Sequence, residues 1–165
     1  MPLDAAWRRR EVSAPSGQFV ARCFARDEDS STAIATSGSK TLILDGEVFG
    51  LGGSPPEHAR LLLERFIESE ESAIEGIEGR FVIALWCDDQ KRLTLYTDKF
   101  ACLPLYHCQI DGGFAFSTSI NALVSMLPQG STFNRRGLVQ FFTFGHLWNE
   151  DTFHESINAC WPSTE

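Results

Sequence analysis

Thiols, imidazoles and paired carboxylates are the side chains of this 165-residue sequence that could take part in hydrolytic or transfer chemistry. A cysteine or serine nucleophile needs a base beside it, and a reactive cysteine also needs an exposed, electropositive setting. No local signature such as Gly-x-Ser-x-Gly surrounds any cysteine or histidine. The residues that we therefore expect to be partly buried, unreactive groups are Cys23, Cys87, Cys102, Cys108, Cys160, His58, His107, His146 and His154.

One histidine adjoins a cysteine directly, at His107 and Cys108. Successive side chains on a strand point to opposite faces, so we predict that these two groups do not meet. The odd number of cysteines, with no C-x-x-C pair, predicts neither a disulfide framework nor a zinc site. We expect reduced thiols in the core, no bound metal and no other cofactor.

The segment Asp45-Gly46-Glu47 places two carboxylates beside a glycine, directly after the apolar run of residues 41–44. An Asp-Gly pair favours a tight turn, so we expect the strand to end here. The carboxylates would then lie at the rim of a sheet, where the amine of a ligand can be bound. The alternative is a turn without a ligand.

The charge balance excludes several classes of partner. Fourteen basic and 22 acidic side chains give a net charge of −8, which argues against an extended nucleic-acid-binding face, and we expect residues 8–10 and 135–136 to be solvated surface. No stretch is long and apolar enough to span a bilayer, and residues 1–4 carry no signal peptide, so we expect a cytoplasmic protein. The glycine-rich residues 50–53 lack the lysine and hydroxyl groups of a phosphate-binding loop.

Hydrophobic patterning predicts the elements that must position these groups. Strands are expected at residues 18–24, 32–36, 41–44, 80–87, 92–97, 103–109 and 113–117, and helices at residues 54–67, 119–127 and 134–144. Pro128 ends the second helix, and Leu138, Phe141 and Phe142 form the apolar face of the third. The tail would dock on the core through Trp148, Phe153, Ile157 and Trp161. This order predicts two layers of antiparallel sheet with flanking helices in one domain, residues 1–165.

Five segments, in the same order, resemble the N-terminal glutamine amidotransferase domain of the asparagine synthetase family. Residues 44–49 resemble its Asn-Gly-Glu-Ile-Tyr segment, and residues 77–86 resemble its Leu-x-Gly-x-Phe-Ala-Phe-Ala strand. Residues 97–106 are similar to Arg-Asp-x-x-Gly-x-x-Pro-Leu-Tyr, residues 116–123 to Phe-Ala-Ser-Glu-x-Lys-Ala-Leu, and residues 152–162 to the closing Thr-x-x-x-x-Ile and Pro-Pro-Gly. The resemblance implies an α+β fold, a four-layer αββα Ntn-hydrolase-like sandwich of two mainly antiparallel sheets flanked by helices.

The resemblance also implies roles for individual residues. It assigns a vestigial glutamine pocket to Asp45, Gly46, Glu47 and Glu57, and a structural part of the motifs to Gly79, Asp98 and Pro104. The family's nucleophile is an N-terminal cysteine whose own α-amino group acts as the base. Position 2 is a proline here, and the first cysteine, Cys23, falls within an expected strand. We therefore expect no catalytic residue.

Two further departures affect the pocket. Asp45 stands where the family has its oxyanion asparagine, and Pro55 stands where an aspartate grips the substrate amine. The resemblance thus implies an inactive glutaminase-like domain that serves as a scaffold for an ATP-dependent amide-forming synthetase domain, as in β-lactam synthetases and lasso-peptide cyclases. The ATP-pyrophosphatase domain of the family, with its Ser-Gly-Gly-x-Asp-Ser loop, has no counterpart in these residues.

Two other functions remain open. The first is a stand-alone binding or dimerisation module that uses the acidic surface and the aromatic residues 141–161. The second is an active hydrolase that uses Ser13, Ser16 or Cys23 after processing.

Overall fold

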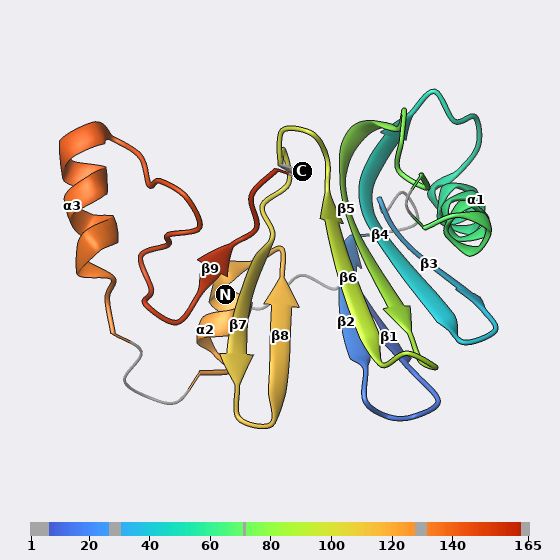
Figure 1. Cartoon of the computed structure of the whole chain (residues 1–165), viewed down its shortest axis with the longest axis horizontal. Coiled ribbons are helices and arrows are strands. Elements are labelled where there is room, and N and C mark those ends of the chain that lie inside the picture. The colour runs from blue at the N-terminus through green and yellow to red at the C-terminus, as the bar shows by residue number, and fades with distance from the viewer. Residues whose placement is uncertain (1–6, 27–30, 71, 128–131, 163–165) are drawn as a thin grey trace. The chain divides into compact units, whose positions relative to one another are not determined.

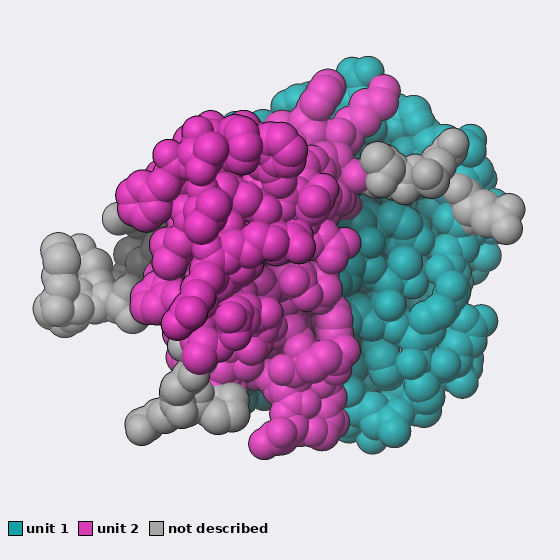
Figure 2. All heavy atoms as spheres, turned by 60° about the vertical axis from the view of Figure 1, so that its left-hand side comes forward, with its two compact units in different colours: residues 1–96 teal, residues 97–165 magenta. Residues whose placement is uncertain are grey.

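The computed structural model describes residues 7–26, 31–70, 72–127 and 132–162. The chain divides into two compact units, residues 1–96 and residues 97–165, coloured teal and magenta in Figure 2. Helices and mostly antiparallel sheets make up the described part of the chain, which confirms the α+β class.

The N-terminal unit contains a two-stranded and a four-stranded sheet (Figure 1). In the first, β1 (Trp7–Ser13) pairs antiparallel with β2 (Val20–Arg26). The second has the order β3 (Thr32–Ser37), β4 (Lys40–Phe49), β5 (Glu78–Cys87) and β6 (Arg92–Thr97). Both β4 and β5 are therefore interior strands, as the continuous apolar run of residues 80–87 predicts.

Helix α1 (Pro55–Glu68) covers one face of the four-stranded sheet. It begins at Ser54 as expected, and its two prolines occupy the first turn, where their missing N–H groups have no helical partner to lose. Its apolar stripe, Ala59, Leu62, Leu63 and Phe66, is buried against Leu42, Leu44, Phe81, Ile83 and Leu85 of β4 and β5. Ile67, the last residue of the helix expected at residues 54–67, is exposed.

The opposite face of the same sheet carries the alternate residues of β4 and β5. Trp86 on this face stacks on Phe19, which precedes β2, with ring centroids 5.3 Å apart and planes 8° apart. Ile43 and Ala84 are paired across the strands and are buried on the same face. By alternation, Asp45 belongs to this face and not to the face that α1 covers.

The predicted turn at Asp45-Gly46 is wrong. Strand β4 continues to Phe49, and its register with β5 runs unbroken from Asp45 opposite Val82 to Glu47 opposite Arg80. Gly46 adopts a φ of 115° and donates its N–H to the Ser31 carbonyl, 3.2 Å away. A glycine inside a strand gives a local distortion of this kind without ending it, so the positive φ that favours a turn is used within the sheet.

The C-terminal unit is built on a three-stranded sheet of order β8 (Gly113–Ser117), β7 (Tyr106–Ile110) and β9 (Asn158–Ala159). The strands expected at residues 103–109 and 113–117 correspond to β7 and β8, which pair as an antiparallel hairpin that turns at Asp111-Gly112. Helix α2 (Ile120–Val124) packs on the sheet around Cys108, Ala115, Leu123 and Ile157, which are all buried. Pro128, predicted to end this helix, lies outside the described residues.

Helix α3 (Arg135–Phe144) lies within the helix expected at residues 134–144, and Asn134 caps it by accepting a hydrogen bond from the Gly137 N–H at 3.0 Å. Its expected apolar face is not buried: Phe142 is 82% exposed and Phe141 44%. The residue of α3 that is buried is Gly137, where an added Cβ would lie 2.8 Å from the Thr152 carbonyl. The helix thus contacts the following loop through Gly137 and polar side chains, and also through the ring pairs Phe141–Phe153 and Phe144–Trp148.

The tail docks only in part. Ile157 is fully buried, but Trp148 and Trp161 stay about half exposed. Among the described residues, no helix combines the length and the apolarity that crossing a membrane requires.

Candidate functional site

Asp45 lies on β4 between Thr32 of β3 and Val82 of β5. It is half-buried, and its Oδ1 accepts a hydrogen bond of 2.8 Å from the Thr32 hydroxyl. A carboxylate has acceptor oxygens and no N–H donor. At this point the chain therefore provides an acceptor inside the sheet, where an asparagine of the same shape would also provide a donor.

Glu47 lies two residues farther along β4 and is exposed. Its carboxylate is 3.0 Å from the Arg80 guanidinium on the neighbouring strand, and both side chains are more than half exposed. Such solvated pairs contribute about 0–1 kcal/mol. The pair links Glu47 of β4 to Arg80 of β5 and leaves both side chains open to water.

Gly79 is the glycine that permits β5 to approach β4. A Cβ at this position would lie 2.3 Å from the Glu47 carbonyl and 3.1 Å from the Val48 Cα. These are backbone atoms, which cannot move aside as a side chain can. The family's glycine is therefore required by close packing next to Glu47.

Glu57 serves as the third residue of α1. Its Oε2 accepts hydrogen bonds from the Ser54 N–H at 2.6 Å and from the Ser54 hydroxyl at 2.9 Å, which is the reciprocal half of a capping box. These bonds, the backbone bond first, lower the pKa of the Glu57 carboxyl below its ordinary 4.5. Pro55 lies between them in sequence and has no polar side-chain group.

The half-buried Cys23 lies in the middle of β2, opposite Arg10. Burial and, next, the negative charge of Asp45 raise the pKa of the Cys23 thiol above its ordinary 9.0. A thiol with a raised pKa holds its proton at neutral pH and is a weak nucleophile. Cys23 and Asp45 are thus close enough to interact electrostatically, in a sense that opposes activation.

Asp98 organises the turn that precedes β7. It is 2% exposed, and its carboxylate accepts hydrogen bonds from the backbone N–H groups of Phe100 and Cys102, each at 3.0 Å. The turn holds Ala101 at a φ of 46°. Pro104 follows the turn and is exposed. Asp98 thus holds the backbone of this turn through its carboxylate.

The predicted pocket residues are held by different partners. Asp45 bonds to Thr32, Glu47 to Arg80 and Glu57 to Ser54. Asp45 also lies on the sheet face opposite α1, whereas Glu57 is part of α1. Among the described residues, no hydrogen bond or ion pair joins these carboxylates to one another.

Sequence reasoning missed the partners Thr32 and Arg80. Thr32 lies opposite Asp45, and Arg80 lies opposite Glu47, because of the way the strands pair. The expected turn at Asp45-Gly46 would have ended the strand before this pairing could be predicted.

The prediction that His107 and Cys108 do not meet agrees with their surroundings: His107 stacks on Phe114, and Cys108 is buried beside Ala115 and Leu123.

The family described as "Glutamine amidotransferase domain" matches residues 57–164, well over half of the chain. This range contains Gly79, Asp98 and Pro104 and begins after Asp45. The glutamine-hydrolyzing asparagine synthetase 3 of Bacillus subtilis (strain 168) is 28% identical over 87 residues, which are 52% of this chain and 14% of that protein.

The chain therefore spans only a small part of the curated relative that it resembles, well under two thirds of its length. The match still covers the β5 strand, the Asp98 turn and the β7–β8 hairpin that carry the motifs. This chain belongs to the glutamine amidotransferase domain family and is related to asparagine synthetase.

Proposed function

We propose that this chain is a catalytically inactive glutaminase-like domain that supports an ATP-dependent amide-forming synthetase domain. The proposal includes the four-layer αββα Ntn-hydrolase-like sandwich of the family as the fold. Asp45, Gly46, Glu47 and Glu57 are then the remains of a glutamine pocket.

The observation that carries the proposal is the carboxylate of Asp45. Hydrolysis of a carboxamide passes through a tetrahedral intermediate whose oxygen bears a negative charge, and an oxyanion hole stabilises that charge with donors. A carboxylate in the place of the asparagine removes one donor and repels the charge. Loss of a single such donor costs about 10²–10³ in rate.

The surroundings of Cys23 support the same proposal. Burial and, next, the negative charge of Asp45 keep the pKa of this thiol raised. Residues 7–19 precede it, so its own backbone nitrogen is a peptide N–H in the β1–β2 hairpin and cannot act as the base of an N-terminal nucleophile.

The region around Glu57 gives a third line of support. The family's amine-gripping aspartate is Pro55 in this chain, which offers no acceptor on its side chain. The neighbouring Glu57 carboxylate is already bonded to Ser54 in the capping box. Binding of a glutamine ammonium here would compete with the start of α1.

A diazoketone analogue of glutamine, which alkylates an activated thiolate in a glutamine pocket, tests the inactivity. We expect intact-mass spectrometry of the purified chain to detect no adduct under conditions that label the Bacillus subtilis asparagine synthetase. An adduct on Cys23 that is prevented by excess glutamine would contradict the proposal.

The scaffold role is tested on the transcript that encodes this chain. We expect the reading frame to continue past codon 165 into a Ser-Gly-Gly-x-Asp-Ser loop, the ATP-binding signature of the synthetase domain. A stop codon directly after codon 165 would contradict the scaffold role in this polypeptide.

A second candidate function is a stand-alone binding or dimerisation module, and the exposed aromatic side chains of the C-terminal unit favour it. Phe142 is 82% exposed, and Phe133, Phe144 and Trp148 are each about half exposed or more. Exposed apolar groups in such number typify association surfaces. Sedimentation equilibrium tests this second function. Self-association of the chain that weakens in Phe142→Ser supports it, and a monomer at high concentration excludes dimerisation.

A further inference from the structure

The C-terminal unit carries a cleft that uses none of the residues of the proposed glutamine pocket. It has a volume of about 600 Å³ and is lined by Arg136, Asn149, Glu150, Asp151, Asn158 and Trp161. A smaller hollow of about 240 Å³ shares Asn149 and Trp161 and adds His146 and Trp148. Volumes of a few hundred Å³ are typical of sites for small molecules.

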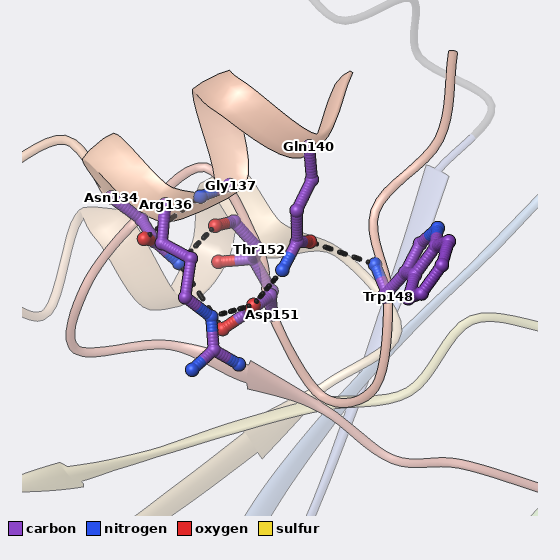
Figure 3. A network of polar contacts seen from close by, with 7 residues as sticks. All are labelled: Asn134, Arg136, Gly137, Gln140, Trp148, Asp151 and Thr152. Atoms are coloured by element: carbon purple, nitrogen blue, oxygen red, sulfur yellow. Dashed lines mark hydrogen bonds and ion pairs between the residues drawn. The ribbon is translucent and has the colours of Figure 1, made fainter. Parts of the chain in front are cut away.

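Hydrogen bonds hold one wall of this cleft in place (Figure 3). The Asp151 carboxylate accepts bonds of 2.8 Å from the Arg136 Nε and from the Gln140 side-chain amide. The Gln140 side-chain oxygen in turn accepts a hydrogen bond from the backbone N–H of Trp148 at 2.9 Å. Helix α3 and the loop of residues 148–152 are thus joined by side chains that would otherwise be free to rotate, so the wall is preorganised.

The loop itself is also fixed. Ala159 of the β9 strand donates its N–H to the Glu150 carbonyl at 2.9 Å, and Asn149 adopts a φ of 57°. Asparagine adopts this left-handed conformation more readily than other residues with a side chain, so the loop turns here at little cost. The hydrogen bond from Ala159 holds the backbone of Glu150 beside β9.

The cleft offers opposite charges at separate places. Figure 3 shows the Arg136 guanidinium bound to Asp151 through Nε, with its two terminal nitrogens pointing away from the helix. Asp151 accepts bonds from three side chains, those of Arg136, Gln140 and Asn134, so its carboxylate is largely satisfied. Glu150 adds an exposed carboxylate to the lining. The charged groups that can meet a ligand are thus the Arg136 guanidinium and the Glu150 carboxylate, beside the side-chain amides of Asn149 and Asn158.

We propose that this cleft binds a zwitterionic α-amino acid with an aromatic side chain. The ligand carboxylate pairs with the terminal nitrogens of Arg136, whose planar fork matches a carboxylate. The ligand ammonium pairs with Glu150, and its ring packs on Trp161. A phosphorylated ligand fits less well, because Glu150 and Asp151 repel a multiply charged anion. The proposal is independent of the inactive glutaminase, since the two share no residue.

L-phenylalanine is the probe, and the indole N–H signals of the protein in a two-dimensional NMR spectrum are the readout. We expect saturable shifts of the Trp161 signal, assigned with Trp161→Phe, at a Kd on the order of 1 mM. N-acetyl-L-phenylalanine lacks the ammonium and L-phenylalanine amide lacks the carboxylate. Each should bind about ten-fold more weakly or worse, because one of the two charge pairs is lost.

Matched variants test which protein side chain pairs with each charged group of the ligand. Arg136→Gln should weaken binding of L-phenylalanine about ten-fold and make the protein indifferent to loss of the ligand carboxylate. Arg135→Gln removes the neighbouring exposed arginine, which does not line the cleft, and should leave binding unchanged. Glu150→Gln should remove the preference for the ligand ammonium, and Glu68→Gln on α1 should not.

Three results overturn the proposal. The first is the absence of saturable shifts up to about 20 mM of L-phenylalanine. The second is equal binding of L-phenylalanine and its two derivatives, which needs no variant and so holds even if Arg136→Gln fails to fold. The third is an equal loss of binding in Arg135→Gln and Arg136→Gln.

Discussion

Two backbone positions illustrate how single residues determine the local structure. Gly79 has backbone atoms of β4 within the space that a Cβ would fill, and Ala101 adopts a left-handed conformation in a position where the family motif has glycine. The first position requires glycine and has it. The second favours glycine and lacks it. The two positions therefore predict mutational effects of opposite sign.

Gly79→Ala should destabilise the chain by about 1–3 kcal/mol or more, because the new Cβ would lie 2.3 Å from the Glu47 carbonyl and must push β4 and β5 apart. Urea denaturation of the purified variant measures the change. Gly113→Ala is the matched control at the start of β8, where no atom lies within 4 Å of an added Cβ. Equal midpoints for Gly79→Ala and wild type would show that the close approach is absent.

Ala101→Gly should stabilise the chain by about 0.5–1 kcal/mol. Relief of a left-handed alanine gains about 1–2 kcal/mol, and the greater freedom of glycine in the unfolded chain offsets part of it. The same change in the exposed helical residue Ala122 should instead destabilise by about 1 kcal/mol. Thermal unfolding of both variants provides the comparison, and a destabilised Ala101→Gly would refute the assignment of strain to the Asp98 turn.

At the scale of elements, the bounds of helices α1 and α3 are easier to predict from the sequence than the end of strand β4, which carries Asp45. The start of α1 is encoded locally by Ser54, two prolines and Glu57, and the bounds of α3 by Asn134 and Gly145. The Asp45-Gly46 pair is also a local turn signal, but pairing of β4 with strands on both sides overrides it. Such tertiary pairing is invisible in a window of a few residues.

The capping box of α1 predicts a pH dependence of stability. The Ser54 N–H lowers the pKa of Glu57 below 4.5 in the folded chain, and the unfolded chain lacks this bond. A depressed folded pKa contributes stability that is fully present above the unfolded value and is lost as pH falls through the folded value. We therefore expect the wild type to lose this contribution below about pH 4.5.

Urea midpoints measured on both sides of pH 4.5 test this prediction. Glu57→Gln should be less stable than wild type above that pH, and the difference should shrink at more acidic pH. Glu68→Gln, in the last turn of the same helix, leaves the Ser54 bond in place and should keep the wild-type pH slope. A constant difference between Glu57→Gln and wild type at every pH would contradict the role of the carboxylate charge.

At the scale of the whole molecule, the α+β class and the order of the elements from β2 to α3 follow from hydrophobic patterning together with the family motifs, whereas strands β1 and β9 were not expected. Hydrophobic patterning does not predict which element packs against each apolar face. Periodicity identifies Leu138, Phe141 and Phe142 as one side of α3, but it cannot tell that α3 approaches its loop through Gly137 and a polar network. The cleft beside that network was hidden for the same reason, since its lining comes from three separate segments.

The central claim is that the chain does not hydrolyse glutamine. Glutamate release from glutamine by the purified chain, measured beside the Bacillus subtilis glutamine-hydrolyzing asparagine synthetase 3 as positive control, tests it most directly. We expect no glutamate above the protein-free blank, and the same result for Cys23→Ala. Glutamate release that rises in proportion to the chain, persists through repeated purification and disappears in Cys23→Ala would contradict it.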